Sequence, residues 1–203
     1  MKKIHYTDSY LLKPYHPVTI HVAGAGGTGS QVITNLARMN VALQALGHPG
    51  LHVTVFDPDI ITEANIGRQL FSETELGQCK ATAAVTRVNR FFGTTWTAEN
   101  CRYPVRKTQE NGDDRTKPAS KEFMPVPGMN VITEEVNYST IEEKDSGPSC
   151  SLAEALERQD LYINSILAQV GCDILWRMFK EGRTLYRGAY INLDTLRVNP
   201  IPV

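Results

Sequence analysis

The chain has 203 residues, of which 41% are hydrophobic and 21% are charged, and its formal net charge is −1. This balance argues against nucleic-acid binding as the main function, because such surfaces need a clustered excess of Lys and Arg. No apolar run approaches the roughly 18 residues of a membrane-spanning helix, and the N-terminus lacks the apolar segment of a signal peptide. We therefore expect a cytoplasmic protein that acts on neither membranes nor nucleic acids.

The first hundred residues predict a strand, a glycine loop, a helix and a second strand. Val18–Ala23 is a short apolar run with β-branched residues, which is typical of a buried strand. A helix is expected over 28–46, because apolar residues recur on one face and Gly47 and Pro49 follow it. The second strand is expected at 51–56, parallel to the first and beside it.

The elements after the second strand are less regular. Ser72 and Glu75 form a capping-box pattern, after which we expect a helix at 78–92 and a third strand at 94–103. Residues 104–150 are rich in Lys, Glu, Asp, Pro and Ser, and this composition predicts a mobile crossover-like loop.

The C-terminal part, 151–203, regains a regular pattern. Its long apolar stripe predicts a single helix over 151–180, which would span about 40 Å or more at about 1.5 Å per residue. Alternating residues at 189–193 and 197–203 predict a β-hairpin. Together the patterns predict one α/β domain over 1–203, with a Rossmann-like sheet, helices on both faces and a nucleotide at the first strand–helix turn.

Gly24, Gly26 and Gly29 form a G-x-G-x-x-G motif between the first strand and the first helix. Glycines let backbone N–H groups approach phosphate oxygens, and the N-terminus of the helix adds a partial positive charge. Asp57 ends the second strand, where a carboxylate can accept hydrogen bonds from ribose hydroxyls. These features suit NAD, FAD and ATP equally, so they predict a nucleotide site without naming the nucleotide.

Two basic residues downstream of Asp57 favour ATP. Arg68 lies in the loop after the second strand, and Lys80 lies at the start of the next helix. A guanidinium and an ammonium, with a divalent metal, would balance the charge of a triphosphate and orient a leaving pyrophosphate. A dinucleotide needs few fixed charges there, because the glycine loop serves its pyrophosphate. Either residue alone would be read as a surface cation, but both follow the glycine loop.

The four cysteines have no C-x-x-C spacing, which argues against a structural zinc site and predicts free thiols. Cys79 is expected to pack within its helix, and Cys101 and Cys172 are expected to be buried. The five histidines also lack the spacing of metal ligands, so no metal-binding residue is assigned.

Four motifs, GAGGTGS, DPD, NIGRQ and QCK, resemble the ThiF/MoeB/ubiquitin-activating superfamily in order and spacing. The stretches NIGRQLF and RVNRFFGT are most similar to its ThiF-related branch from the plasmid-borne PRTRC cassette. The resemblance implies ATP-dependent adenylation of the C-terminal glycine of a ubiquitin-like or sulfur-carrier-like protein, with Mg²⁺ as a cofactor. It also implies a homodimer.

The resemblance also implies roles for individual residues. Arg68 and Lys80 would act on the ATP phosphates during catalysis, and Cys150, on a crossover loop before the long helix, would be a candidate thiol for a thioester. The residues implied to contact ATP or to support its site are Gly24, Gly26, Gly27, Gly29, Asp57, Asp59, Asn65, Arg68, Gln69 and Lys80.

The sequence departs from the family pattern at one point. No apolar strand after 94–103 ends in the aspartate that holds magnesium in the family. Either the chain has lost one central strand–helix segment or the sequence is an incomplete version of a longer protein. That departure supports an alternative, a non-catalytic scaffold that binds nucleotide or the partner protein. A third reading, an NAD(P)-dependent oxidoreductase, would need a substrate domain with a proton donor, for which the remaining sequence offers no clear candidate.

Overall fold

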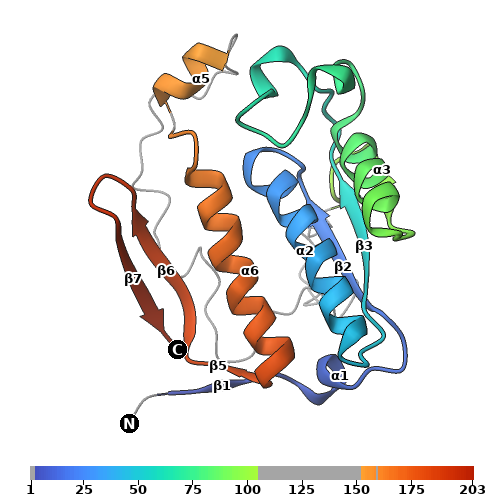
Figure 1. Ribbon diagram of the computed structural model, residues 1–203, viewed down its shortest axis with the longest axis vertical. Helices are drawn as coiled ribbons and strands as arrows, with labels where there is room; N and C mark the ends of the chain where they lie inside the picture. The colour runs from blue at the N-terminus through green and yellow to red at the C-terminus, as the bar shows by residue number, and fades with distance from the viewer. Residues whose placement is uncertain (1–2, 105–151, 159) are drawn as a thin grey trace, which may run out of the picture.

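The structure is a computed structural model that describes residues 3–104, 152–158 and 160–203 (Figure 1). Its centre is a parallel three-stranded sheet in the order β2-β3-β4, in which β2 and β3 pair over their whole length. The three strands are Val18–Ala23 (β2), Leu51–Phe56 (β3) and Thr97–Glu99 (β4). The first two strands and their parallel pairing are confirmed as predicted.

The third strand is shorter than the predicted 94–103, because a side chain closes the preceding turn. Oδ1 of Asn89 accepts hydrogen bonds from the Thr94 hydroxyl at 2.7 Å and from the Trp96 backbone N–H at 3.0 Å. Nδ2 of Asn89 donates to the Trp96 carbonyl at 3.0 Å. The backbone at 94–96 is therefore bonded to the preceding helix, and only three residues reach the sheet.

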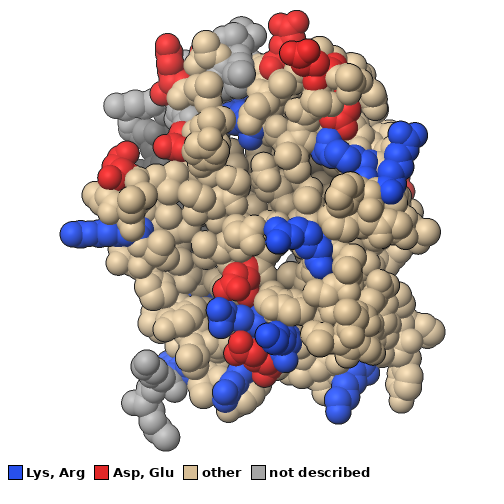
Figure 2. Space-filling model, viewed as in Figure 1, with Lys and Arg blue, Asp and Glu red and all other residues tan. Residues whose placement is uncertain are grey.

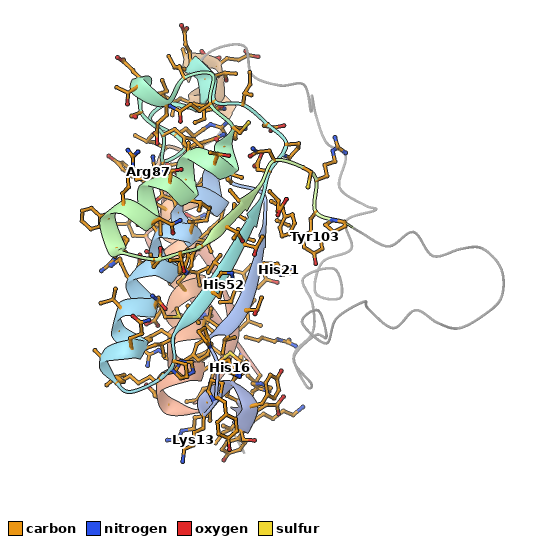
Figure 3. The ribbon with its side chains drawn as sticks, turned by 90° about the vertical axis from the view of Figure 1, so that its right-hand side faces the viewer. Lys13, His16, His21, His52, Arg87 and Tyr103 are labelled. Atoms are coloured by element: carbon orange, nitrogen blue, oxygen red, sulfur yellow. The ribbon has the colours of Figure 1, made fainter. Side chains whose placement is uncertain are left out.

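Three helices lie against one face of this sheet, α2 (Gly27–Ala45), α3 (Lys80–Phe92) and α6 (Ile163–Glu181) (Figures 1 and 3). The alternation along β3 explains this arrangement, because Leu51, Val53 and Val55 point into the core and are at most 5% exposed. Both predicted N-terminal helices are confirmed to within two residues of their expected ends. Among the described residues, no helix is both long and apolar enough to cross a membrane.

The opposite face of the sheet carries polar and aromatic side chains. The rings of His21, Phe56 and Tyr103 pack edge-on or tilted, and Nδ1 of His21 lies 3.3 Å from the Tyr103 hydroxyl (Figure 3).

Within the described residues, the helices that the sequence predicts beside the sheet lie on one of its faces. The predicted crossover loop and the predicted loss of a strand–helix segment concern 104–150, of which only Pro104 is described, and they stay predictions.

The single helix predicted for 151–180 is wrong. The structure has two helices, α5 (Leu152–Arg158) and α6, which begins at Ile163. Just before α6, Oδ1 of Asp160 accepts a hydrogen bond from the Tyr162 N–H at 2.9 Å, the local bond with which an aspartate competes against helix formation. With 19 residues, α6 is about 28 Å long, shorter than predicted.

The N-terminal strand pairs with the segment that directly follows α6. Strand β1 (His5–Tyr6) pairs antiparallel with β5 (Arg183–Thr184), directly after the left-handed Gly182 that ends the helix. The short helix α1 (Ser9–Leu12) follows β1.

The chain finishes as the predicted hairpin, with β6 (Tyr186–Asn192) paired to β7 (Arg197–Pro202) beside α6. On the face seen in Figure 2, acidic and basic side chains are interspersed over α2 and α6, in keeping with the near-neutral composition.

Candidate functional site

The glycine loop joins β2 to α2 through a tight backbone turn. Gly24 has φ +96°, a conformation that favours glycine. A Cβ atom on Gly29 would lie 2.0 Å from the Gly24 carbonyl oxygen, so the loop folds directly onto the first turn of the helix. Cβ atoms on Gly24 and Gly26 would meet nothing within 4 Å. The outer side of the loop is therefore bare backbone beside a helix N-terminus, where an anion can approach closely.

Asp57 fastens this loop to the end of β3. Its carboxylate is 4% exposed, and Oδ2 accepts a hydrogen bond from the Ala25 N–H at 2.6 Å. Oδ1 accepts from the Asp59 N–H at 2.8 Å. Through these two hydrogen bonds Asp57 holds the shape of the loop. The side chain of Asp59, by contrast, is 64% exposed and faces solvent.

Lys80 joins the same network from the start of α3. Its Nζ lies 3.0 Å from Oδ2 of Asp59, and its backbone N–H donates to the Asp59 carbonyl at 2.9 Å. The Lys80 residue is only 7% exposed, so its ammonium is held close to the acidic turn. A continuous set of contacts thus links the glycine loop, Asp57, Asp59 and Lys80, four parts that the sequence assigned to one site.

The NIGRQ segment begins in a short helix, η1 (Glu63–Asn65). The two amide residues of the segment, Asn65 and Gln69, are buried. Oδ1 of Asn65 accepts from the Thr62 N–H at 2.9 Å, and the Asn65 carbonyl accepts from the Gln69 N–H at 2.9 Å. These bonds fold the segment around the partly exposed Arg68. Oε1 of Gln69 is buried and has no hydrogen-bond partner among the described residues. Asn65 and Gln69 therefore shape the segment that presents Arg68.

Ser30 connects this segment to the glycine loop and was missed as a site residue. It is 1% exposed, and its Oγ accepts a hydrogen bond from the Leu70 N–H at 3.1 Å while lying 3.3 Å from the Gly27 carbonyl. Its position as the last residue of the GAGGTGS motif was the available signal.

A model of the ThiF family matches residues 11–115, just over half of the chain. The chain belongs to the ThiF family. The match spans every glycine-loop, acidic-turn and NIGRQ residue described above, and it includes Lys80.

Known relatives are similar to part of this ThiF-family chain. It is 38% identical over 79 residues to ubiquitin-activating enzyme E1 2 of Arabidopsis thaliana, covering 38% of this chain and 7% of the relative. It is 38% identical over 85 residues to the NEDD8-activating enzyme E1 catalytic subunit of Caenorhabditis elegans, covering 41% and 18%. The chain therefore spans less than a fifth of the length of these curated relatives.

A solved structure supports the fold beyond this region. The crystal structure of Escherichia coli MccB with ATP superposes with a TM-score of 0.55 at 14% identity, covering 95% of this chain and 64% of MccB. At that identity the likeness concerns the fold, and it confirms the Rossmann-like architecture of the ThiF-family chain.

The ThiF-family site is braced on its outer side by Arg87 of α3. Its Nη1 lies 2.7 and 2.8 Å from the two carboxylate oxygens of Glu75, and its Nη2 donates to the Leu70 carbonyl at 2.5 Å. The guanidinium also lies 5.6 Å from the centre of the Phe71 ring. Glu75 completes the predicted capping box with Ser72 around a short helix, η2 (Glu73–Glu75).

Replacing Arg87 with alanine is expected to lower the free energy of unfolding by about 1–2 kcal/mol, because the Glu75 carboxylate and the Leu70 carbonyl lose a charged hydrogen-bond donor. Urea unfolding of the two proteins measures the difference. Arg177→Ala is the matched control, since its pairs with Asp173 and Glu181 lie on an exposed stretch of α6 and are expected to have a clearly smaller effect on stability. Equal effects of the two substitutions would contradict a bracing role for Arg87.

Three of the four cysteines, Cys79, Cys101 and Cys172, lie within the described residues. The candidate nucleophile Cys150 lies outside the described residues. Cys101 is exposed, which contradicts the expected burial, because β4 ends at Glu99 and the chain leaves the sheet there. Cys79 immediately precedes α3 and is partly buried, and Cys172 is buried as predicted. Burial raises the pKa of the Cys172 thiol against the opposing effect of Asn35, which favours the unreactive protonated form.

Among the described residues, no group of three His, Cys, Asp or Glu side chains is placed to hold a metal ion. The carboxylates nearest the glycine loop are those of Asp57 and Asp59, which are already bonded to backbone N–H groups and to Lys80. Magnesium in phosphate sites takes few protein ligands, so two carboxylates and substrate phosphates are chemically adequate for it.

Proposed function

We propose that this ThiF-family chain binds ATP at the glycine loop and adenylates the C-terminus of a ubiquitin-like or sulfur-carrier-like protein. One observation carries the proposal: the buried Lys80 ammonium is joined through Asp59 and Asp57 to the backbone of the glycine loop. A positive group fixed beside bare backbone N–H groups suits a polyphosphate better than a neutral ligand.

The residues fit ATP at three points. Open space outside Gly24 and Gly26 leaves room for phosphate oxygens, and the N-terminus of α2 favours their charge. The acidic pair Asp57 and Asp59 would receive the ribose, with Asp59 the more exposed of the two. Arg68 would supply a second positive group from the NIGRQ segment.

The proposed reaction needs no general base. A carboxylate oxygen of the partner's C-terminal glycine attacks the α-phosphorus, and the bond from that phosphorus to the bridging oxygen breaks to release pyrophosphate. The chain's contribution is to position the two reactants and to balance charge on the leaving group through Arg68 and Lys80. Magnesium, when bound, would neutralise further phosphate charge.

Exchange of labelled pyrophosphate into ATP tests this proposal, with magnesium present and either ubiquitin or a sulfur-carrier protein bearing a free C-terminal glycine. Arg68→Ala is expected to lower the exchange rate about 100-fold or more, because one fixed positive charge at the leaving group is lost. Arg90→Ala, on the exposed side of α3, is the control and is expected to retain wild-type exchange. Equal activity of Arg68→Ala and the wild type would contradict the assigned role.

The scaffold alternative rests on the sequence, in which no apolar strand after 94–103 ends in an aspartate. Tight ATP binding without exchange would support it, whereas preferential binding of NAD(P) would support an oxidoreductase. The homodimer, the cytoplasmic location, the PRTRC-type branch and a thioester at Cys150 remain predictions from the sequence.

A further inference from the structure

We propose that Asn164, in the first turn of α6, is a positioning residue for the glycine loop and that it tunes the affinity for the phosphates of the nucleotide. The inference rests on the proposed nucleotide site and adds a residue that lies outside the ThiF match and outside every motif of the sequence. It makes the C-terminal part of the chain a component of that site.

The contact is direct and partly buried. Asn164 is 7% exposed, and its Oδ1 accepts a hydrogen bond from the Thr28 hydroxyl at 3.0 Å, across 136 residues of sequence. A Cβ atom on Gly27 would lie 2.5 Å from Nδ2 of Asn164 and 2.8 Å from its Cγ. The amide group therefore lies flat against the backbone of Gly27, in the space that any larger residue would fill.

The contact of Asn164 lies at the N-terminus of α2, where the proposed phosphate site is. Gly27 and Thr28 are the first two residues of α2, whose N–H groups have no partner within the helix and would face a bound phosphate. α2 and α6 lie side by side with their N-terminal ends at the same end of the molecule (Figure 1). Asn164 thus fixes the orientation of these backbone donors at Gly27 and Thr28, while Asp57 holds the loop at Ala25.

The neutral amide of Asn164 suggests a substitution that tests its role directly. A neutral amide can bond to Thr28 without repelling a phosphate, whereas Asn164→Asp keeps the shape and the acceptor and adds a negative charge. Such a charge beside the first turn of α2 opposes anion binding at short range. A residue that only packed two helices together would show no dependence on the phosphates of the ligand.

The experiment compares the affinities of the full chain for ATP and for adenosine by calorimetric titration, at a temperature where melting curves show each variant folded. Asn164→Asp is expected to weaken ATP binding at least 10-fold and to leave adenosine binding within twofold of wild type. Thr28→Val, which removes the hydroxyl and keeps the volume, is expected to weaken ATP binding about threefold or more. If Asn164→Asp does not fold, the ATP affinity of Thr28→Val decides the question.

The matched control is Asn40→Ala. Asn40 is also a buried asparagine but lies in α2, and its Oδ1 accepts from the Leu51 N–H at 2.7 Å, away from the glycine loop. It is expected to lower the melting temperature without changing the affinity for ATP. If the Asn164 and Thr28 variants behave as this control does, Asn164 is only a packing residue and the inference is wrong. If the wild type itself does not bind ATP, the proposed nucleotide site fails and the inference falls with it.

Discussion

Alanine at position 29 is expected to abolish measurable ATP binding and to lower the free energy of unfolding by about 1–3 kcal/mol. The new Cβ would lie 2.0 Å from the carbonyl oxygen of Gly24 and 2.9 Å from its carbonyl carbon. Both are backbone atoms and cannot rotate away, so the loop must move off the first turn of α2. That movement would also break the hydrogen bond from the Ala25 N–H to Asp57.

Urea unfolding and an ATP titration measure the two effects of Gly29→Ala. Gly171→Ala is the matched control, because Gly171 lies within α6 and a Cβ there would meet nothing within 4 Å. This control is expected to leave ATP binding unchanged and to stabilise the helix by up to about 1 kcal/mol. Wild-type affinity in Gly29→Ala would show that the close approach within the loop is not needed for the nucleotide.

Ile33→Ala is expected to cost about 2–5 kcal/mol of unfolding free energy, the largest effect on stability. Ile33 is fully buried on the side of α2 that belongs to the hydrophobic core, so truncation leaves a cavity that rigid neighbours fill only in part. Chemical denaturation with fluorescence detection of the buried Trp96 measures the loss.

Val41→Ala provides the comparison within the same helix. Val41 is 48% exposed, and its truncation is expected to change stability by less than about 1 kcal/mol. A similar loss in both variants would mean that the core does not lie beneath α2 as described.

The β2–α2–β3 unit was predictable because every local signal agreed. The apolar runs of both strands are bounded by glycines, and the periodicity of α2 ends at Gly47. The break between α5 and α6 was not predictable from periodicity, because the apolar stripe continues through it. The hydrogen bond of Asp160 that accompanies the break depends on a conformation, not on a pattern of hydrophobicity.

The candidate site was also predictable from the sequence only in part. The residues of the acidic turn, the NIGRQ segment and Lys80 were named from motifs, and contacts around the glycine loop now join these segments. The contact of Ser30 with Leu70 and that of Thr28 with Asn164 could not be predicted, since they join residues 40 and 136 positions apart. Such pairs depend on how helices pack, which no short stretch of sequence encodes.

The pairing of β1 with β5 has a consequence for how the protein assembles during synthesis. The Thr7 hydroxyl donates to the Met178 carbonyl at 2.8 Å, and the Thr7 N–H donates to the Gly182 carbonyl at 2.8 Å. Thr7 is synthesised long before these partners, because Thr7 and Met178 lie 171 residues apart in the sequence. A nascent chain can form the β2–α2–β3 unit early, but one side of α2 stays uncovered until α6 emerges. Completion of the fold and of the contacts around the glycine loop therefore waits for α6 and depends on contacts of long sequence separation.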